Sequence, residues 1–127
     1  MYRIILGTYL LFMVTMLTRC EPVTEVSELV KQTERIQVVF NSNLGDYTDI
    51  TDKKQIRKFK GYITDEPTPI YECGYDGYML FFTEAGSVRM DFNLTDDCQH
   101  VIYDYGQSIE TRQLSADGLE YLRSIVP

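Results

Sequence analysis

Four strand-like segments follow one another between residues 78 and 114, and their spacing constrains the fold more than any other feature. In the second segment the apolar residues Val88, Met90 and Phe92 alternate with polar residues, which is typical of a strand with one buried and one solvated face. The connections are as short as EAGS and GQS, so consecutive strands are expected to run antiparallel in a meander. The segments are YMLFF (78–82), SVRMDFNL (87–94), HVIYDY (100–105) and IETRQL (109–114).

Elements of a different kind flank the meander. RIQVVF, residues 35–40, is rich in β-branched and aromatic residues and predicts a first strand. A short amphipathic helix is expected from about Lys53 to Tyr62, because Asp52 offers an N-cap and apolar residues then recur at helical spacing. Ser115 offers a second N-cap before a closing helix. The order strand, helix, four strands, helix predicts an α+β domain with an antiparallel sheet of about five strands and its helices on one face.

The amino terminus has the layout of an export signal. Arg3 precedes an apolar or neutral run from Ile4 to Thr18, as in secretory signals. The run is shorter than the roughly 20 apolar residues that a membrane-spanning helix needs. We therefore expect residues 1–20 to be an export or lipoprotein signal, residues 21–34 to be a tether, and residues 35–127 to form a single domain.

Cys20 lies at the boundary of this signal, and three kinds of processing remain open. Leu17, Thr18 and Cys20 match the end of a bacterial lipoprotein signal, which predicts lipidation of Cys20. Arg19 stands where such signals normally carry Gly, Ala or Ser, so cleavage after Cys20 and an uncleaved anchor are the alternatives. We predict attachment to a membrane through the N-terminus, with the domain exported to the cell envelope, periplasmic or associated with the outer membrane.

The other two cysteines fall inside the folded part. Cys73 precedes the first strand of the meander, and Cys98 stands just before the third. These strands start at the same end of an antiparallel meander, so a disulfide is expected between Cys73 and Cys98, with Cα atoms within about 7 Å. Such a bond fits an exported chain, because disulfides persist in oxidising compartments.

YECGYDGYMLFF, residues 71–82, crowds a cysteine, glycines and tyrosines together and raises the question of a site. A disulfide-anchored turn leading into a strand explains these residues structurally. The alternative is a small hydrolase-like enzyme in which His100 works with Asp76 or Asp104. Two cysteines and one histidine are too few for structural zinc, and the turn aspartates lack the spacing of an EF-hand, so no metal or cofactor is expected.

The chain is acidic, with a formal net charge of −7 that becomes −9 without residues 1–20. Because polyanions bind basic surfaces, we expect no nucleic-acid partner. Half of the ten cations after residue 20 fall in the first predicted helix: Lys53, Lys54, Arg57, Lys58 and Lys60. They form either the solvated face of an amphipathic helix or a face that lies on anionic lipid.

The polar face of the meander is the candidate binding surface. If the helices cover the other face, this one carries polar side chains with a few apolar residues among them, as recognition surfaces do. We expect an envelope protein or component to contact Met79, Phe81, Arg89, Asp91, Ile102 and Asp104. The predicted function is therefore that of a noncatalytic, membrane-tethered envelope protein that binds a partner.

Five motifs are spread over most of the chain: the signal ending at a cysteine, ITDKKQI, CGYDG before a strand, DC before a later strand, and LSADGLEYL at the final helix. Together they resemble those of small uncharacterised lipoproteins of Gram-negative bacteria. The resemblance implies an envelope location and a disulfide, and it implies no particular activity.

Overall fold

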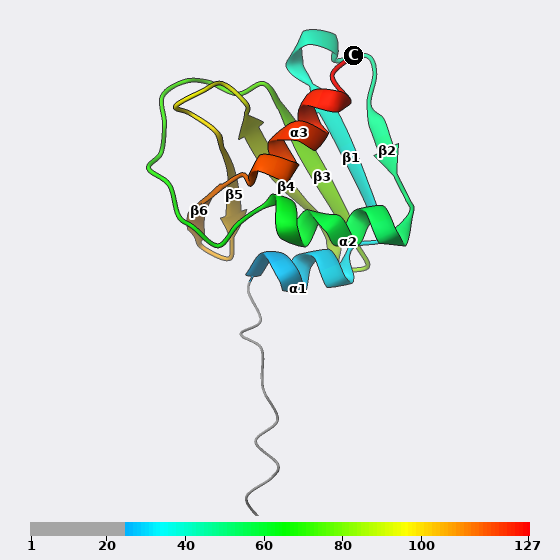
Figure 1. Cartoon of the computed structure of the whole chain (residues 1–127). Coiled ribbons are helices and arrows are strands. Elements are labelled where there is room, and N and C mark those ends of the chain that lie inside the picture. The colour runs from blue at the N-terminus through cyan, green and yellow to red at the C-terminus, as the bar shows by residue number, and fades with distance from the viewer. Residues whose placement is uncertain (1–24) are drawn as a thin grey trace, which may run out of the picture.

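The computed structural model describes residues 25–127 and shows a six-stranded antiparallel sheet with three helices (Figure 1). The predicted α+β class is confirmed, with one strand more than the five expected. In chain order the elements are α1 (Glu25–Gln32), β1 (Arg35–Phe40), the 3-10 turn η1 (Asn41–Asn43), β2 (Thr48–Ile50), α2 (Lys53–Tyr62), β3 (Gly77–Thr83), β4 (Gly86–Asn93), β5 (His100–Tyr105), β6 (Ser108–Gln113) and α3 (Ala116–Ser124).

The predicted signal, residues 1–20 with Cys20, lies outside the described residues. The first part of the predicted tether, residues 21–24, lies outside them as well. Within residues 25–127, no helix is long and apolar enough to cross a membrane.

The sheet has the strand order β2-β1-β3-β4-β5-β6, in which β3 to β6 form the predicted meander. All neighbouring strands are antiparallel. Strand β1 pairs with β3 along its whole length, from Arg35 opposite Phe82 to Phe40 opposite Gly77. Strand β2 has three residues, too few to show a period in the sequence, and its pairing with β1 adds the sixth strand.

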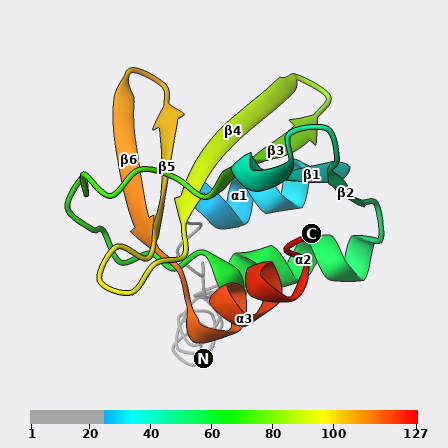
Figure 2. The same cartoon turned by 90° about the horizontal axis from the view of Figure 1, so that it is seen from above.

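Helices α2 and α3 begin where their sequence signals predict. Asp52 Oδ1 accepts a hydrogen bond from the Lys54 N–H (3.1 Å), and Ser115 Oγ accepts one from the Gly118 N–H (3.0 Å), so each helix has an N-cap. The two helices lie side by side on one side of the sheet (Figure 2). Gly118 permits this close approach, because a Cβ atom at its position would collide with the backbone of Tyr62.

An apolar core fills the space between the sheet and the helices. Phe59 of α2 meets Phe81 of β3 edge-on, with ring centroids 5.9 Å apart, and Phe40 meets Phe92 in the same way at 5.4 Å. Side chains alternate along a strand, so every second residue of the central strands points into this core. The strand residues of this core are Ile36, Val38, Phe40, Ile50, Met79, Phe81, Met90, Phe92, Val101 and Tyr103.

Helix α1 corrects the expectation that residues 21–34 form a tether. Val26 and Val30 are each 2% exposed and belong to the core. The carboxylate of Glu25 accepts a hydrogen bond from Tyr103 Oη (3.0 Å), so the start of the helix is tied to β5. For residues 25–34 the tether prediction is wrong, because a helix of two turns buries only two positions here, which is too few to show a clear helical period.

Candidate functional site

The pairing register decides which side chains share the sheet face opposite the helices. Arg89 lies opposite Leu80, and Asp91 lies opposite Tyr78 on one side and Ile102 on the other. We call this surface the open face: Arg35, Gln37 and the buried Val39 of β1, Tyr78, Leu80 and Phe82 of β3, Arg89 and Asp91 of β4, and Ile102 and Asp104 of β5. Four of the six predicted contact residues are therefore on the same face: Arg89, Asp91, Ile102 and Asp104.

Met79 and Phe81 are not on the open face, and the prediction that they contact a partner is wrong. Both are 0% exposed and belong to the core. Met79 lies opposite Met90 and Phe81 opposite Val88, so they point toward the helices. The cause of the error is that a shift of one residue along a strand moves a side chain to the other face of the sheet. The residues of β3 that do reach the open face are the half-buried Tyr78, Leu80 and Phe82.

Arginine side chains lie against aromatic rings on the open face. The guanidinium carbon of Arg89 is 3.9 Å from the ring centroid of Tyr78, and that of Arg35 is 5.8 Å from the ring centroid of Phe82. Arg35 also pairs with Asp49 (2.6 Å), and this hydrogen bond raises the pKa of Arg35 above its usual value. Both side chains are therefore held in place as fixed positive charges next to apolar surface.

The connection between α2 and β3, residues 63–76, covers another part of the same side of the sheet. The hydroxyl of Thr111 on β6 accepts a hydrogen bond from the Thr68 N–H (3.3 Å) and donates one to the Thr68 carbonyl. Asn93 at the end of β4 donates a hydrogen bond to the Gly74 carbonyl (2.7 Å). These contacts place the connection over one end of β4, β5 and β6, whereas Tyr78, Leu80 and Phe82 of the open face remain half-exposed among the described residues.

The predicted disulfide between Cys73 and Cys98 is present and anchors this connection. It joins Cα atoms 6.3 Å apart across 25 residues of sequence. Gly74 next to it has a φ of 73°, a left-handed conformation that favours glycine. The stretch YECGYDG is therefore a covalently fixed turn, and an intramolecular disulfide fits an oxidising location.

His100 lies beneath the same connection. Its ring is fully buried, with its centroid 5.0 Å from the ring centroid of Tyr71 and 5.8 Å from that of Tyr75. Nδ1 lies 2.6 Å from the carbonyl oxygen of Cys98, which can only accept, so Nδ1 carries the proton. Nε2 is buried without a hydrogen-bond partner among the described residues.

The hydrolase-like alternative requires a carboxylate beside His100. Asp104 lies four residues further along β5, which corresponds to about 13 Å. The Asp76 carboxylate accepts a hydrogen bond from the Leu94 N–H (2.6 Å). Within residues 25–127, His100 forms no hydrogen bond or ion pair with either aspartate, and so the described structure offers no acid–base pair there.

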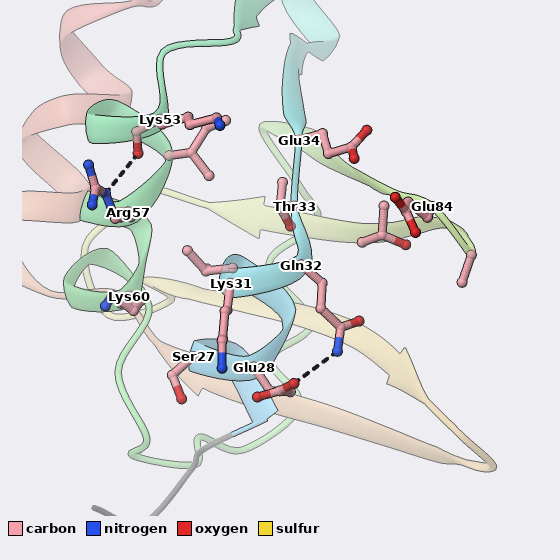
Figure 3. A pocket seen from close by; sticks show the side chains of 14 residues that line it. Ser27, Glu28, Lys31, Gln32, Thr33, Glu34, Lys53, Arg57, Lys60 and Glu84 are labelled. Carbon is pink, nitrogen blue, oxygen red and sulfur yellow. Dashed lines mark hydrogen bonds between the residues drawn. The ribbon is translucent and has the colours of Figure 1, made fainter.

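A groove of about 1020 Å³ lies between α1, α2 and the β3–β4 turn (Figure 3). Lys53, Arg57 and Lys60 line its α2 wall, whereas Glu34 and Glu84 stand on the opposite rim. The sequence indicated the cations of α2 but not the groove, because one of its walls is α1, which was not predicted.

Within residues 25–127, no group of three or more His, Cys, Asp or Glu side chains is placed to hold a metal ion. Comparisons with protein-family models, with curated proteins and with solved structures found no match to this chain. Its function is therefore inferred from its own surfaces, of which the open face and the cationic side of α2 are the most distinctive.

Proposed function

We propose that this protein is a noncatalytic cell-envelope protein, membrane-tethered at its N-terminus, that binds a partner protein or envelope component through the open face. The observation that carries the proposal is the composition of this face. Tyr78, Leu80 and Phe82 form a half-buried apolar row along β3. Arg35 and Gln37 of β1 border the row on one side, and Arg89 and Asp91 of β4 border it on the other. Recognition surfaces have this arrangement of apolar anchors within a polar rim.

The arginine pairs of the open face also favour binding. Arg89 is held between the ring of Tyr78 and the carboxylate of Asp91, at 2.9 Å from the latter. A side chain that is already ordered loses less conformational freedom when a partner binds, and Tyr and Arg are enriched among the residues that dominate binding energy.

The exported location rests on two independent features. Residues 1–20 have the layout of an export signal that ends at Cys20, which is the candidate site of lipidation. The Cys73–Cys98 disulfide fits an oxidising compartment, where such bonds persist. A noncatalytic role is favoured because His100, the one histidine of the chain, is fully buried.

Site-specific photocrosslinking in the native cells tests the proposal. A photoreactive amino acid replaces Leu80 in the full chain, and the matched control carries it at Leu44, which is 70% exposed in the β1–β2 connection. The expected result is one discrete adduct from position 80 and none from position 44. Adducts of the same pattern from both positions, or none from position 80, contradict the proposal.

A pair of substitutions separates binding from folding. Leu80→Lys is expected to abolish the adduct formed from position 82 while the melting temperature falls by only a few degrees, because the apolar stem of lysine still covers the sheet. Leu44→Lys is expected to change neither. If Leu80→Lys leaves crosslinking intact, the open face is not the binding surface.

A further inference from the structure

The charge of α2 differs from that of the rest of the domain. Residues 25–127 hold ten of the 12 Lys and Arg residues and 18 of the 19 Asp and Glu residues, which gives a net charge of −8. Helix α2 alone carries five cations and no carboxylate within its ten residues. The rest of the described domain therefore carries −13, and α2 is a compact positive surface on a strongly negative protein.

The cations of α2 also differ from those of the rest of the domain in their ion pairs. Each of the four arginines outside this region forms an ion pair: Arg35 with Asp49, Arg89 with Asp91, Arg112 with Glu25 and Glu110, and Arg123 with Asp96. Lys31 of α1 and the five cations of α2 form no ion pair with any residue of the described domain. The described domain has 18 carboxylates that could pair with these six cations, and none does. The cations therefore indicate a surface that is complementary to an anionic ligand outside the domain.

The position of these cations around α2 shows how such a contact is made. Ile56 and Phe59 turn to the core and are 2% and 1% exposed. At 100° per residue, the cations occupy an arc of about 160° on the outward side. The apolar side of α2 is therefore already used within the fold, and its outward side can attract a ligand by charge but cannot insert into a bilayer as an interfacial helix does.

The point at which the chain enters the domain lies next to this surface. Helix α1 begins at Glu25, packs against α2, and is held by hydrogen bonds from Tyr103 and Arg112 to the Glu25 carboxylate. Figure 1 shows α1 and α2 together at one end of the domain, with the C-terminus at the opposite end. A membrane anchor that precedes α1 therefore holds the end with α2 nearest to the bilayer.

From these observations we propose that the outward side of α2, together with Lys31, docks the domain on an anionic phospholipid surface. This rests on the proposed function for one element, the N-terminal membrane tether, which raises the local concentration of lipid headgroups. Glu34 and Glu84 on the far rim of the groove, and Asp117 and Glu120 beside Lys58 in the groove between α2 and α3, repel anionic headgroups, so the contact is confined to the outward arc of α2. The exposed Lys54 and Lys58 lie on this arc and contribute to the contact. Because α2 and the open face lie on opposite sides of the sheet, docking leaves the open face free for a partner.

The test uses the full chain mixed with two kinds of vesicle, one of phosphatidylcholine alone and one with about 30% phosphatidylglycerol. Flotation reports whether the chain attaches to a bilayer at all. An amine-acylating reagent then reports, by peptide mass spectrometry, how accessible Lys53 and Lys60 are. We expect acylation of both lysines to be severalfold slower on the anionic vesicles than on the neutral ones, and salt near 1 M to abolish the difference.

Two double variants with equal changes of charge provide the comparison. Lys54→Gln/Lys58→Gln removes two outward cations of α2, and Arg89→Gln/Arg123→Gln removes two cations elsewhere that are also exposed. Each cation near an anionic surface contributes about fivefold to binding, so the first variant is expected to lower the ratio of docked to undocked domain by about 25-fold. In the second variant, Lys53 and Lys60 are expected to be as well protected from acylation on anionic vesicles as in the natural chain.

The outcomes separate this inference from the proposed function. Flotation with both vesicles but equal acylation on both overturns the docking and leaves the tether standing. If the chain floats with anionic vesicles only, and Lys54→Gln/Lys58→Gln abolishes this flotation, the result supports the docking and refutes the tether. Protection of the lysines by poly-glutamate, without protection by anionic vesicles, overturns the proposal in favour of an acidic protein partner.

Discussion

On the helix-covered face of the sheet, Phe81 is fully buried between β-strands and α2, whereas Leu80, one residue away along β3, is only half-buried on the open face. The two faces are built from the same strands, and their side chains alternate along each strand. On one face apolar side chains meet helices and form a core. On the other, the half-buried row of β3 is bordered by paired charges, and none of the three helices of the described residues lies above it.

The sheet itself therefore does not determine which of its faces becomes core. The elements that pack on the sheet, here α1, α2 and α3, determine which face is buried. The connection of residues 63–76 likewise buries the part of the sheet that it covers. Where it crosses β5 and β6, even the polar side chains His100 and Thr111 become buried, at 0% and 8% exposure.

The largest effect is expected from truncating one residue on each face. Phe81→Ala leaves a cavity in the core and is expected to lower the free energy of unfolding by about 3–5 kcal/mol. Leu80→Ala removes a side chain that keeps contact with water and is expected to lower it by about 1 kcal/mol. Urea denaturation of both variants measures the two losses. Equal losses would contradict the assignment of one buried and one open face.

Removing the disulfide tests how strongly residues 63–76 are held on the sheet. Cys73→Ser/Cys98→Ser is expected to lower the free energy of unfolding by about 3 kcal/mol, since the bond closes a ring across 25 residues. Hydrogen exchange should then increase at residues 63–76 and around His100, while the amides of β1 and β3 stay protected. A uniform loss of protection through the whole sheet would show that this connection and the core unfold as one unit.

A smaller effect is expected at the arginine that lies on Tyr78. Arg89→Ala removes an exposed ion pair and a contact with the ring, so the free energy of unfolding should fall by less than about 1 kcal/mol. Partner crosslinking from position 80 should fall strongly in the same variant. The prediction is wrong if the stability loss exceeds that of Phe81→Ala or if crosslinking is unchanged.

The smallest effect concerns pH at the edge of the helix-covered face. Hydrogen bonds from Arg112 and Ser108 lower the pKa of Glu110 below its usual value. The carboxylate therefore adds stability at pH values above the unfolded pKa of about 4.3, and this contribution disappears as the pH falls through the folded pKa. Glu110→Gln should be slightly less stable than the natural chain at pH 7, and the difference should shrink as the pH falls below the unfolded pKa of about 4.3. Urea midpoints across this range measure the difference, and a gap that persists at low pH would rule out the carboxylate as its source.

Much of the fold could be predicted because its signals are local. The N-caps Asp52 and Ser115 are read directly from residue type, and they place the starts of α2 and α3. Two elements escaped prediction for the opposite reason. α1 has eight residues and β2 has three, so neither is long enough to show a period, and each is stabilised by contacts with distant segments.

The candidate site was predictable only in part. The alternation in β4 indicated that Arg89 and Asp91 are on the polar face, because that strand has polar residues at every second position. Strand β3 is apolar on both faces, and its sequence therefore does not distinguish Leu80 from Phe81. Only the pairing of Leu80 with Arg89 separates the two.

Four features could be predicted from the sequence: the α+β class, the order of the meander, the caps of two helices and the cysteines that pair. These depend on side-chain alternation, helical spacing and chain length, which act over a few residues or one strand connection. Only the contacts between distant segments establish which side of β3 is buried and that α1 joins the core. The same contacts leave the cations of α2 without an ion pair within residues 25–127, while the other arginines of this range pair with carboxylates. Those outcomes depend on which distant segments come within contact distance, and no local pattern contains that information.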